Sequence, residues 1–113
     1  KKLSKCLVKN GLFYITATPN IYNLTFFLSK KDFNQNSPGH LFHFNHVNLS
    51  LFFLKNNFLN ICTKFEYLNT PYANTKKDFA NLKNQLKKMN KKVRTTSPPS
   101  VGNMLTAVFK KMA

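Results

Sequence analysis

A formal net charge of +15 on 113 residues limits what this chain can fold into and what it can bind. Eighteen Lys and Arg residues face only three Asp and Glu residues, so most cations have no acidic partner within the chain. A compact domain with this charge repels itself, whereas a bound polyanion neutralises it and releases condensed counterions. Nucleic acid is therefore the expected partner. A membrane surface is disfavoured, because a helix lying on it needs one basic face and one apolar face, and these lysines are spread along the chain.

The type of cation indicates the type of contact. All of the cations except Arg94 are Lys, and a Lys ammonium acts as a point charge where an Arg guanidinium forks onto phosphate or stacks on a base. We therefore expect diffuse contact with phosphates rather than reading of a base sequence. The abundance of Lys, Asn and Phe is also typical of AT-rich organelle genes. It favours a mitochondrial protein, with a plastid protein as the alternative.

Composition predicts one folded domain. Hydrophobic residues make up 42% of the chain, with twelve Phe against three Gly and five Pro, which is not the composition of a disordered tail. The length suits a single domain with one core. We expect a basic extension over residues 1–10 and one RNA-binding domain over residues 11–113, with an apolar insertion at about residues 48–68. No apolar run is long enough for a transmembrane helix.

Alternation of apolar and polar residues predicts strands in the first part of the chain. Residues 11–17 alternate in this way, turn-forming residues follow at 18–20, and a second alternating segment covers residues 22–28. We expect these two strands to form an antiparallel hairpin. A polar loop over residues 30–39 then leads to a third predicted strand over residues 41–47.

Apolar residues at alternating spacings of three and four predict an amphipathic helix between Asn48 and Leu68. Either its apolar stripe packs in the core or it docks a neighbouring protein. The residues predicted for protein docking are Leu51, Leu54, Phe58, Ile61 and Phe65. In this second reading the chain is a basic scaffold protein that binds protein partners, with RNA contact incidental.

A further helix is predicted over residues 70–90, with Thr70 as its N-cap and Pro71 at its first position. Residues 91–96 follow as a short strand. Ser100 is the expected cap of a last helix over residues 101–112. Strands followed by alternating strand and helix indicate an α/β domain with a mixed sheet.

Three short motifs resemble those of the universal small-subunit ribosomal protein S-eleven family. Residues 11–20 fit the pattern G-x-x-x-I-x-A-T-x-N of its first hairpin. Residues 69–73, Asn-Thr-Pro-Tyr-Ala, look like the S-T-P-Y/F-A opening of its first helix. Residues 91–93 and 97–100 look like the strand and turn that come next. The motifs occur in the family's order and together span about residues 8–112.

The resemblance implies a ribonuclease-H-like mixed sheet with an N-terminal antiparallel hairpin and two helices, without nuclease chemistry. It implies a structural role on the platform of the small ribosomal subunit, with small-subunit rRNA and neighbouring small-subunit ribosomal proteins as partners. The positions that inherit an expected rRNA contact are Thr18, Asn20, Thr70, Ser97, Ser100, Gly102 and Asn103. The charged residues that complete the predicted RNA-binding set are Lys30, Lys31, Lys76, Lys77 and Arg94. Where the family has a Gly- and Arg-rich loop, this chain has residues 48–68, so a protein contact is expected to replace an RNA contact there.

Enzymatic and metal sites are not expected. His40, His43 and His46 are three residues apart, and on a strand this spacing places His43 on the face opposite the other two. Two-metal cleavage of RNA needs several convergent carboxylates, and the chain has only three. Cys6 and Cys62 are far apart in the sequence and match no zinc or disulfide pattern. We therefore expect no catalysis, no metal, no cofactor and no small-molecule substrate.

Overall fold

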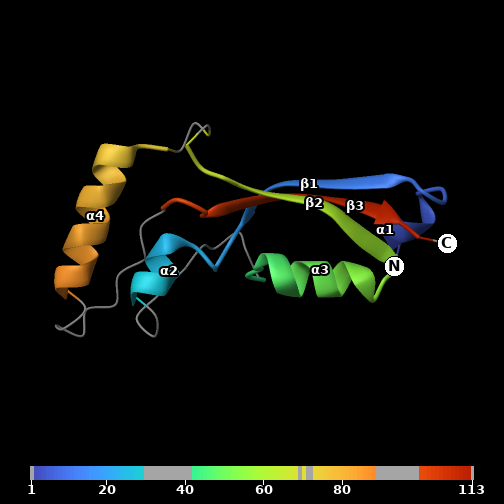
Figure 1. Ribbon diagram of the computed structural model, residues 1–113, viewed down its shortest axis with the longest axis horizontal. Helices are drawn as coiled ribbons and strands as arrows, with labels where there is room; N and C mark the ends of the chain where they lie inside the picture. Colours follow the sequence, from blue (N-terminus) through green and yellow to red (C-terminus); the bar gives the residue numbers. More distant parts are fainter. Residues whose placement is uncertain (1, 30–41, 69, 71–72, 89–99, 113) are drawn as a thin grey trace.

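The computed structural model describes residues 2–29, 42–68, 70, 73–88 and 100–112, and the fold is given for these residues. Helices and strands are combined, which confirms the predicted α/β composition of the fold (Figure 1). In chain order the elements are α1 (Lys2–Lys5), β1 (Leu12–Pro19), α2 (Leu24–Ser29), α3 (His46–Leu54), β2 (Phe58–Glu66), α4 (Thr75–Lys88) and β3 (Met104–Lys111).

The three strands form one sheet in the order β1-β3-β2, and β3 is antiparallel to both neighbours. The last strand in the sequence is therefore the central one. Alternate residues of β3 point to opposite faces of the sheet, and Leu105, Ala107 and Phe109 on one face are fully buried. Within the described part of the chain the sheet is antiparallel throughout, and a single parallel bridge joins Asn20 to Phe44 outside the strands.

Helix α3 lies along the face of the sheet that carries the buried β3 residues (Figure 1). Its first turn is held by a capping box: Asn45 Oδ1 accepts a hydrogen bond from Asn48 N, and Asn48 Oδ1 accepts one from Asn45 N, each at 2.8 Å. The Phe53 ring stacks on the Phe109 ring, with centroids 4.0 Å apart. Burying an aromatic or aliphatic side chain of this size stabilises a fold by about 1.5–3 kcal/mol. This contact is therefore a main attachment of α3 to the sheet.

The predicted N-terminal hairpin is wrong. Residues 22–28, expected as its second strand, mostly lie in helix α2, and β1 pairs with β3 instead. The apolar residues Tyr22 and Phe26 explain the error, because a spacing of four fits both a strand and a helix. In the structure their rings stack at 5.1 Å, and Asn23 Oδ1 accepts a hydrogen bond from Phe26 N at the start of the helix.

The predicted helix between Asn48 and Leu68 is also wrong over most of its length. Helix α3 begins at His46, within the segment expected as a third strand, and ends at Leu54, after which β2 begins at Phe58. Asn57 makes the turn between them with a left-handed φ of 64°, a conformation that Asn tolerates better than most residues. The apolar residues at spacings of three and four therefore lie in a helix, a turn and a strand, and not on one helix.

The helix predicted over residues 70–90 is confirmed in its body but not at its start. Helix α4 begins at Thr75, and its cap is Asn74 rather than Thr70. Asn74 Oδ1 accepts a hydrogen bond from Lys77 N at 3.1 Å, and Asp78 Oδ2 accepts one from Asn74 N at 3.0 Å. This reciprocal pair satisfies backbone N–H groups at the N-terminus of the helix.

The predicted last helix is wrong, because β3 occupies most of residues 101–112. Ser100 does act as a helix cap, but for a different helix: its Oγ accepts a hydrogen bond from Thr25 N in α2 at 3.1 Å. The prediction that Ser100 caps a helix over residues 101–112 is therefore wrong, and the hydrogen bond links two segments that are far apart in the sequence. The predicted loop over residues 30–39 and the predicted strand over residues 91–96 lie outside the described residues.

Candidate nucleic-acid interface

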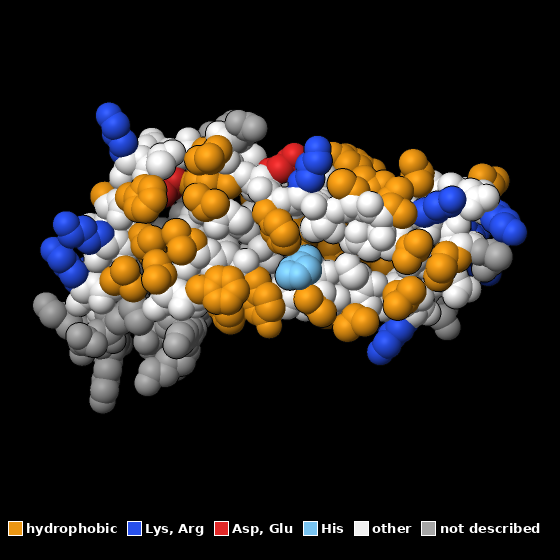
Figure 2. Space-filling view, viewed as in Figure 1, with side chains coloured by type: hydrophobic (Ala, Val, Ile, Leu, Met, Phe, Trp, Pro, Cys, Tyr) orange, Lys and Arg blue, Asp and Glu red, His pale blue; other side chains and the backbone are white. Residues whose placement is uncertain are grey.

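Ten exposed lysines among the described residues are distributed over a molecule whose longest extent is 52 Å. The exposed lysines of the described residues are Lys5, Lys9, Lys55, Lys64, Lys76, Lys77, Lys83, Lys87, Lys88 and Lys110. Figure 2 shows Lys side chains mostly around the periphery of one face and hydrophobic side chains across its middle. The cationic surface therefore surrounds an apolar one.

The acidic side chains of the described residues are held by hydrogen bonds within the fold. Glu66 Oε2 accepts a hydrogen bond from Thr106 Oγ1 at 3.0 Å, and Asp78 belongs to the cap of α4. Lys111 has a structural role as well, because its Nζ donates to the backbone oxygens of Ser4 and Leu7. The exposed lysines, by contrast, are available to an external anion.

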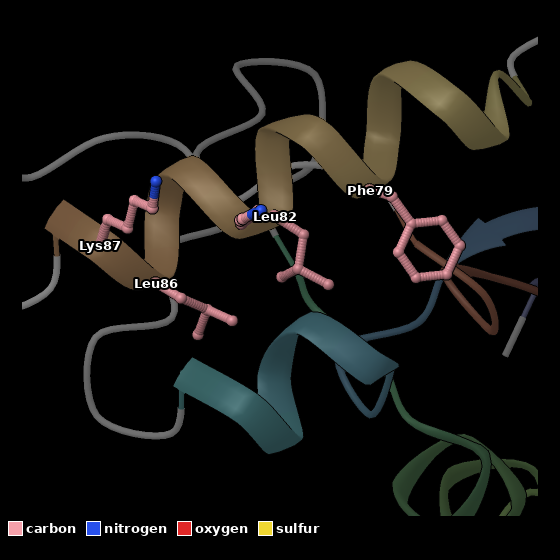
Figure 3. Close-up of a pocket in the computed structure, with 5 residues that line it drawn as sticks. Phe79, Leu82, Leu86 and Lys87 are labelled. Carbon is pink, nitrogen blue, oxygen red and sulfur yellow. The ribbon is translucent and has the colours of Figure 1, made fainter.

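Helix α4 carries an apolar stripe flanked by lysines, and Lys83 and Lys87 line the same depression as Phe79, Leu82 and Leu86. Leu82 and Leu86 point toward α2 in Figure 3, while Lys87 points away from it. Leu82 is buried, whereas Phe79 remains 56% exposed beside a shallow depression along the helix. The predicted RNA-binding residues Lys76 and Lys77 are both exposed in the first turn of α4. That turn is the positive end of the helix dipole, so these two lysines do not stabilise the helix through it.

Two segments predicted to contact rRNA come together where β1 and α2 meet the start of β3. Asn20 is fully buried, and its Nδ2 donates to Gly102 O at 2.7 Å and to Tyr22 O at 2.8 Å. Asn20 N also donates to Asn103 O at 2.7 Å. Gly102 has a left-handed φ of 80°, which favours glycine. The side-chain amide of Asn20 therefore links the end of β1 to the segment that precedes β3, and its Nδ2 donates only to backbone oxygens of the protein in these hydrogen bonds.

The other residues predicted to contact RNA differ in their exposure. Ser100 is buried, and Thr18, Gly102 and Asn103 are half-buried. The Thr70 hydroxyl donates to Tyr67 O at 2.7 Å. Lys30, Lys31, Arg94 and Ser97 lie outside the described residues.

The predicted docking residues do not form one helical stripe. Leu51 and Leu54 are about half exposed on α3, and Ile61 and Phe65 are about half exposed on β2. Phe58 is buried in the core between the sheet and α3, so the prediction that it lines a docking surface is wrong in this fold. Helix α3 has no charged residue, and Val47, Leu51, Phe52 and Leu54 are each about half exposed.

The sheet has a second face that the sequence interpretation missed. Directly paired residues of antiparallel strands point to the same face, so the register places two rows of side chains opposite α3. We define the open face of the sheet by the rows Leu12, Lys110, Leu59 and Tyr14, Val108, Cys62, together with Lys64, Thr106 and Glu66. Tyr14 is 62% exposed. The alternation of Leu12 and Tyr14 was visible in the sequence, but the pairing that brings Lys110 beside them was not.

Comparisons with protein-family models, with curated protein sequences and with solved structures found no match. Among the described residues, no group of three His, Cys, Asp or Glu side chains is placed to hold a metal ion. No helix in the described ranges is long and apolar enough to cross a bilayer. The surface features available for binding are the exposed lysines, the apolar surface of α3 and the open face of the sheet.

Proposed function

We propose that this protein binds and braces structured RNA as a constituent of the small ribosomal subunit, and that it acts by binding rather than by catalysis. The observation that carries the proposal is the net charge of +15, because the acids of the described residues are used in internal hydrogen bonds. Each exposed lysine that meets a phosphate releases condensed counterions, and this release favours binding.

The arrangement of the lysines supports diffuse phosphate contact. They are carried by α4 and α1, which lie at opposite ends of the molecule in Figure 1, and by the sheet and the end of α3, on a body 52 Å long. Lys side chains are flexible point charges and impose little geometry on the phosphates that they meet. A protein of this kind stabilises the positions of RNA segments relative to one another without reading their base sequence.

The proposed partners are small-subunit rRNA and neighbouring small-subunit ribosomal proteins, in a mitochondrion or alternatively in a plastid. The S-eleven resemblance is a weaker support than the charge, because residues 22–28 and 101–112 differ from the elements that it implies. The described strands of the sheet are antiparallel, and the further strand predicted over residues 91–96 lies outside the described residues, so the ribonuclease-H-like mixed sheet stays a proposal.

The test is the salt dependence of binding. The full chain is mixed with small ribosomal subunits or with protein-free small-subunit rRNA, and the bound fraction is measured by sedimentation over a range of salt concentrations. The logarithm of the affinity should fall linearly with the logarithm of salt, by about 0.7–0.9 for each phosphate contacted. An affinity that does not depend on salt, or a chain that does not sediment with either RNA or subunits, would refute the proposal.

A second candidate function is that of a basic scaffold protein that binds protein partners. The observation that favours it is the apolar surface of α3, which continues onto β2 where the His46 and Phe65 rings meet edge to face at 5.5 Å. Apolar docking is insensitive to screening, whereas phosphate contact is not. If a single purified ribosomal protein retains this chain at high salt in the absence of RNA, the scaffold function is favoured over RNA binding.

A further inference from the structure

The open face of the sheet combines an exposed aromatic ring with cations. Tyr14 lies on β1 opposite Val108, and the next row of the sheet places Lys110 between Leu12 and Leu59. Neighbouring positions on one face of a sheet are about 5–8 Å apart, so the ring and the ammonium group can contact the same nucleotide.

This face is accessible, since α3 covers the opposite side of the sheet (Figure 1). Tyr14 is 62% exposed, Leu12 57% and Leu59 48%, and Lys64 and Lys110 are exposed as well. Glu66 lies two residues from Lys64 on the same face and accepts a hydrogen bond from Thr106, the residue paired with Lys64. Lys110 lies four residues further along β3 than Thr106, in the row with Leu12 and Leu59. The end of the face that carries Tyr14 and Lys110 is therefore apolar and cationic, whereas Lys64 has an acidic neighbour.

We propose that the open face of the sheet binds unpaired RNA, with Tyr14 stacking on a base and Lys110 contacting a flanking phosphate. The inference rests on the proposed function and specifies which form of RNA this surface takes. Aromatic side chains on a cationic surface bind single strands because every base has a stacking face. Paired bases are stacked within a helix and cannot present that face to Tyr14.

The position of Lys110 argues against a protein on this face. An apolar partner that covered Leu12 and Leu59 would also bury the Lys110 ammonium, at a cost of several kcal/mol without an acidic partner. A second copy of the chain would bring another charge of +15 to the same surface. A phosphate neutralises Lys110 directly, while a base covers the apolar neighbours.

The experiment compares a labelled single-stranded oligouridylate with a blunt RNA duplex of the same length, using the full chain and Tyr14→Ala. The substitution should weaken binding of the single strand by about 5- to 150-fold, which corresponds to losing one aromatic-base stack. Binding of the duplex should be unchanged. Tyr14→Phe should bind as the unsubstituted protein does, and Phe42→Ala serves as the matched control because Phe42 is exposed and lies outside the sheet.

A second measurement does not depend on the folding of any variant. The unsubstituted protein is cross-linked to an oligonucleotide that contains 4-thiouridine, and the adduct should be found within residues 12–16. If the oligonucleotide binds but the adduct lies elsewhere and Tyr14→Ala has no effect, the open face is not the site and the proposed function stands. If neither RNA binds at any salt concentration, the proposed function fails together with this inference. If a purified ribosomal protein protects Tyr14 from modification and RNA does not, the occupant is a protein and the inference is overturned.

Discussion

Helices α3 and α4 show two different ways in which a helix of this protein meets its surroundings. The fourteen residues of α4 include five Lys, and its apolar stripe, of which only Leu82 is buried, points toward α2 and is flanked by Lys83 and Lys87. The nine residues of α3 include no Lys, Arg, Asp or Glu, and Val47, Leu51, Phe52 and Leu54 remain about half exposed beside the polar His46, Asn48 and Ser50. A helix with apolar residues on its outer side is often covered by another surface. Under the proposed functions, α4 would meet RNA and the outer side of α3 would meet another protein.

The largest expected effect concerns the attachment of α3 to the sheet. Phe109→Ala removes the fully buried ring that stacks on Phe53, and it should lower the free energy of unfolding by about 3–5 kcal/mol. Chemical denaturation followed by circular dichroism measures the loss. Phe42→Ala is the control, and it should change stability by about 0.5 kcal/mol or less because Phe42 is 75% exposed. Equal losses in the two variants would show that α3 is not anchored through its inner side.

The next effect tests the cationic side of α4. Replacing Lys83, Lys87 and Lys88 with Gln removes three exposed charges. If each contacts a phosphate, affinity for rRNA should fall on the order of 100-fold at about 0.1 M salt, and the slope of log affinity against log salt should fall by about 2–3. Filter binding over a salt series measures both quantities.

The matched control replaces the same three residues with Arg, which preserves charge and should preserve the slope. The Gln variant should lose only a small part of its stability, because Lys87 and Lys88 also interact with the negative end of the helix dipole. An unchanged salt slope in the folded Gln variant would remove α4 from the RNA-binding surface. The contrast between the two helices would then have no functional meaning.

The same contrast explains which elements the sequence could predict. Strand β1 as far as Ala17 and the body of α4 each follow a single period and were predicted correctly, although β1 continues to Pro19, within the segment expected as a turn. Tyr22 and Phe26 fit two periods, and the apolar spacing from Leu51 to Phe65 runs through a helix, a turn and a strand. In such segments tertiary contacts decide between helix and strand, and the local spacing of apolar residues does not reveal those contacts.

Strand β3 and the open face of the sheet depend on pairing between distant parts of the chain. Phe109 pairs with Phe13 on one side and with Asn60 on the other, so its burial follows from residues far away in the sequence. The same register places Lys110 beside Leu12 and Leu59. Ser100 and Asn20 were predicted as a cap of the last helix and as an RNA contact, whereas in the structure their side chains make hydrogen bonds to segments far away in the sequence, which only the fold reveals.

The smallest expected effect on the isolated protein concerns the outer side of α3. Replacing Leu51 and Leu54 with Gln should change the free energy of unfolding by about 0.5 kcal/mol or less per residue, because both side chains are about half exposed and Gln is a good helix former. RNA affinity and its salt slope should stay the same. Retention on small ribosomal subunits at high salt should fall, since apolar docking persists when phosphate contacts are screened. Leu68→Gln, at an exposed position outside the helices, is the control. If the α3 variant and this control are retained equally, the apolar surface of α3 is not what holds the protein on the subunit at high salt. Helices α3 and α4 would then differ in composition but not in the kind of partner that they bind.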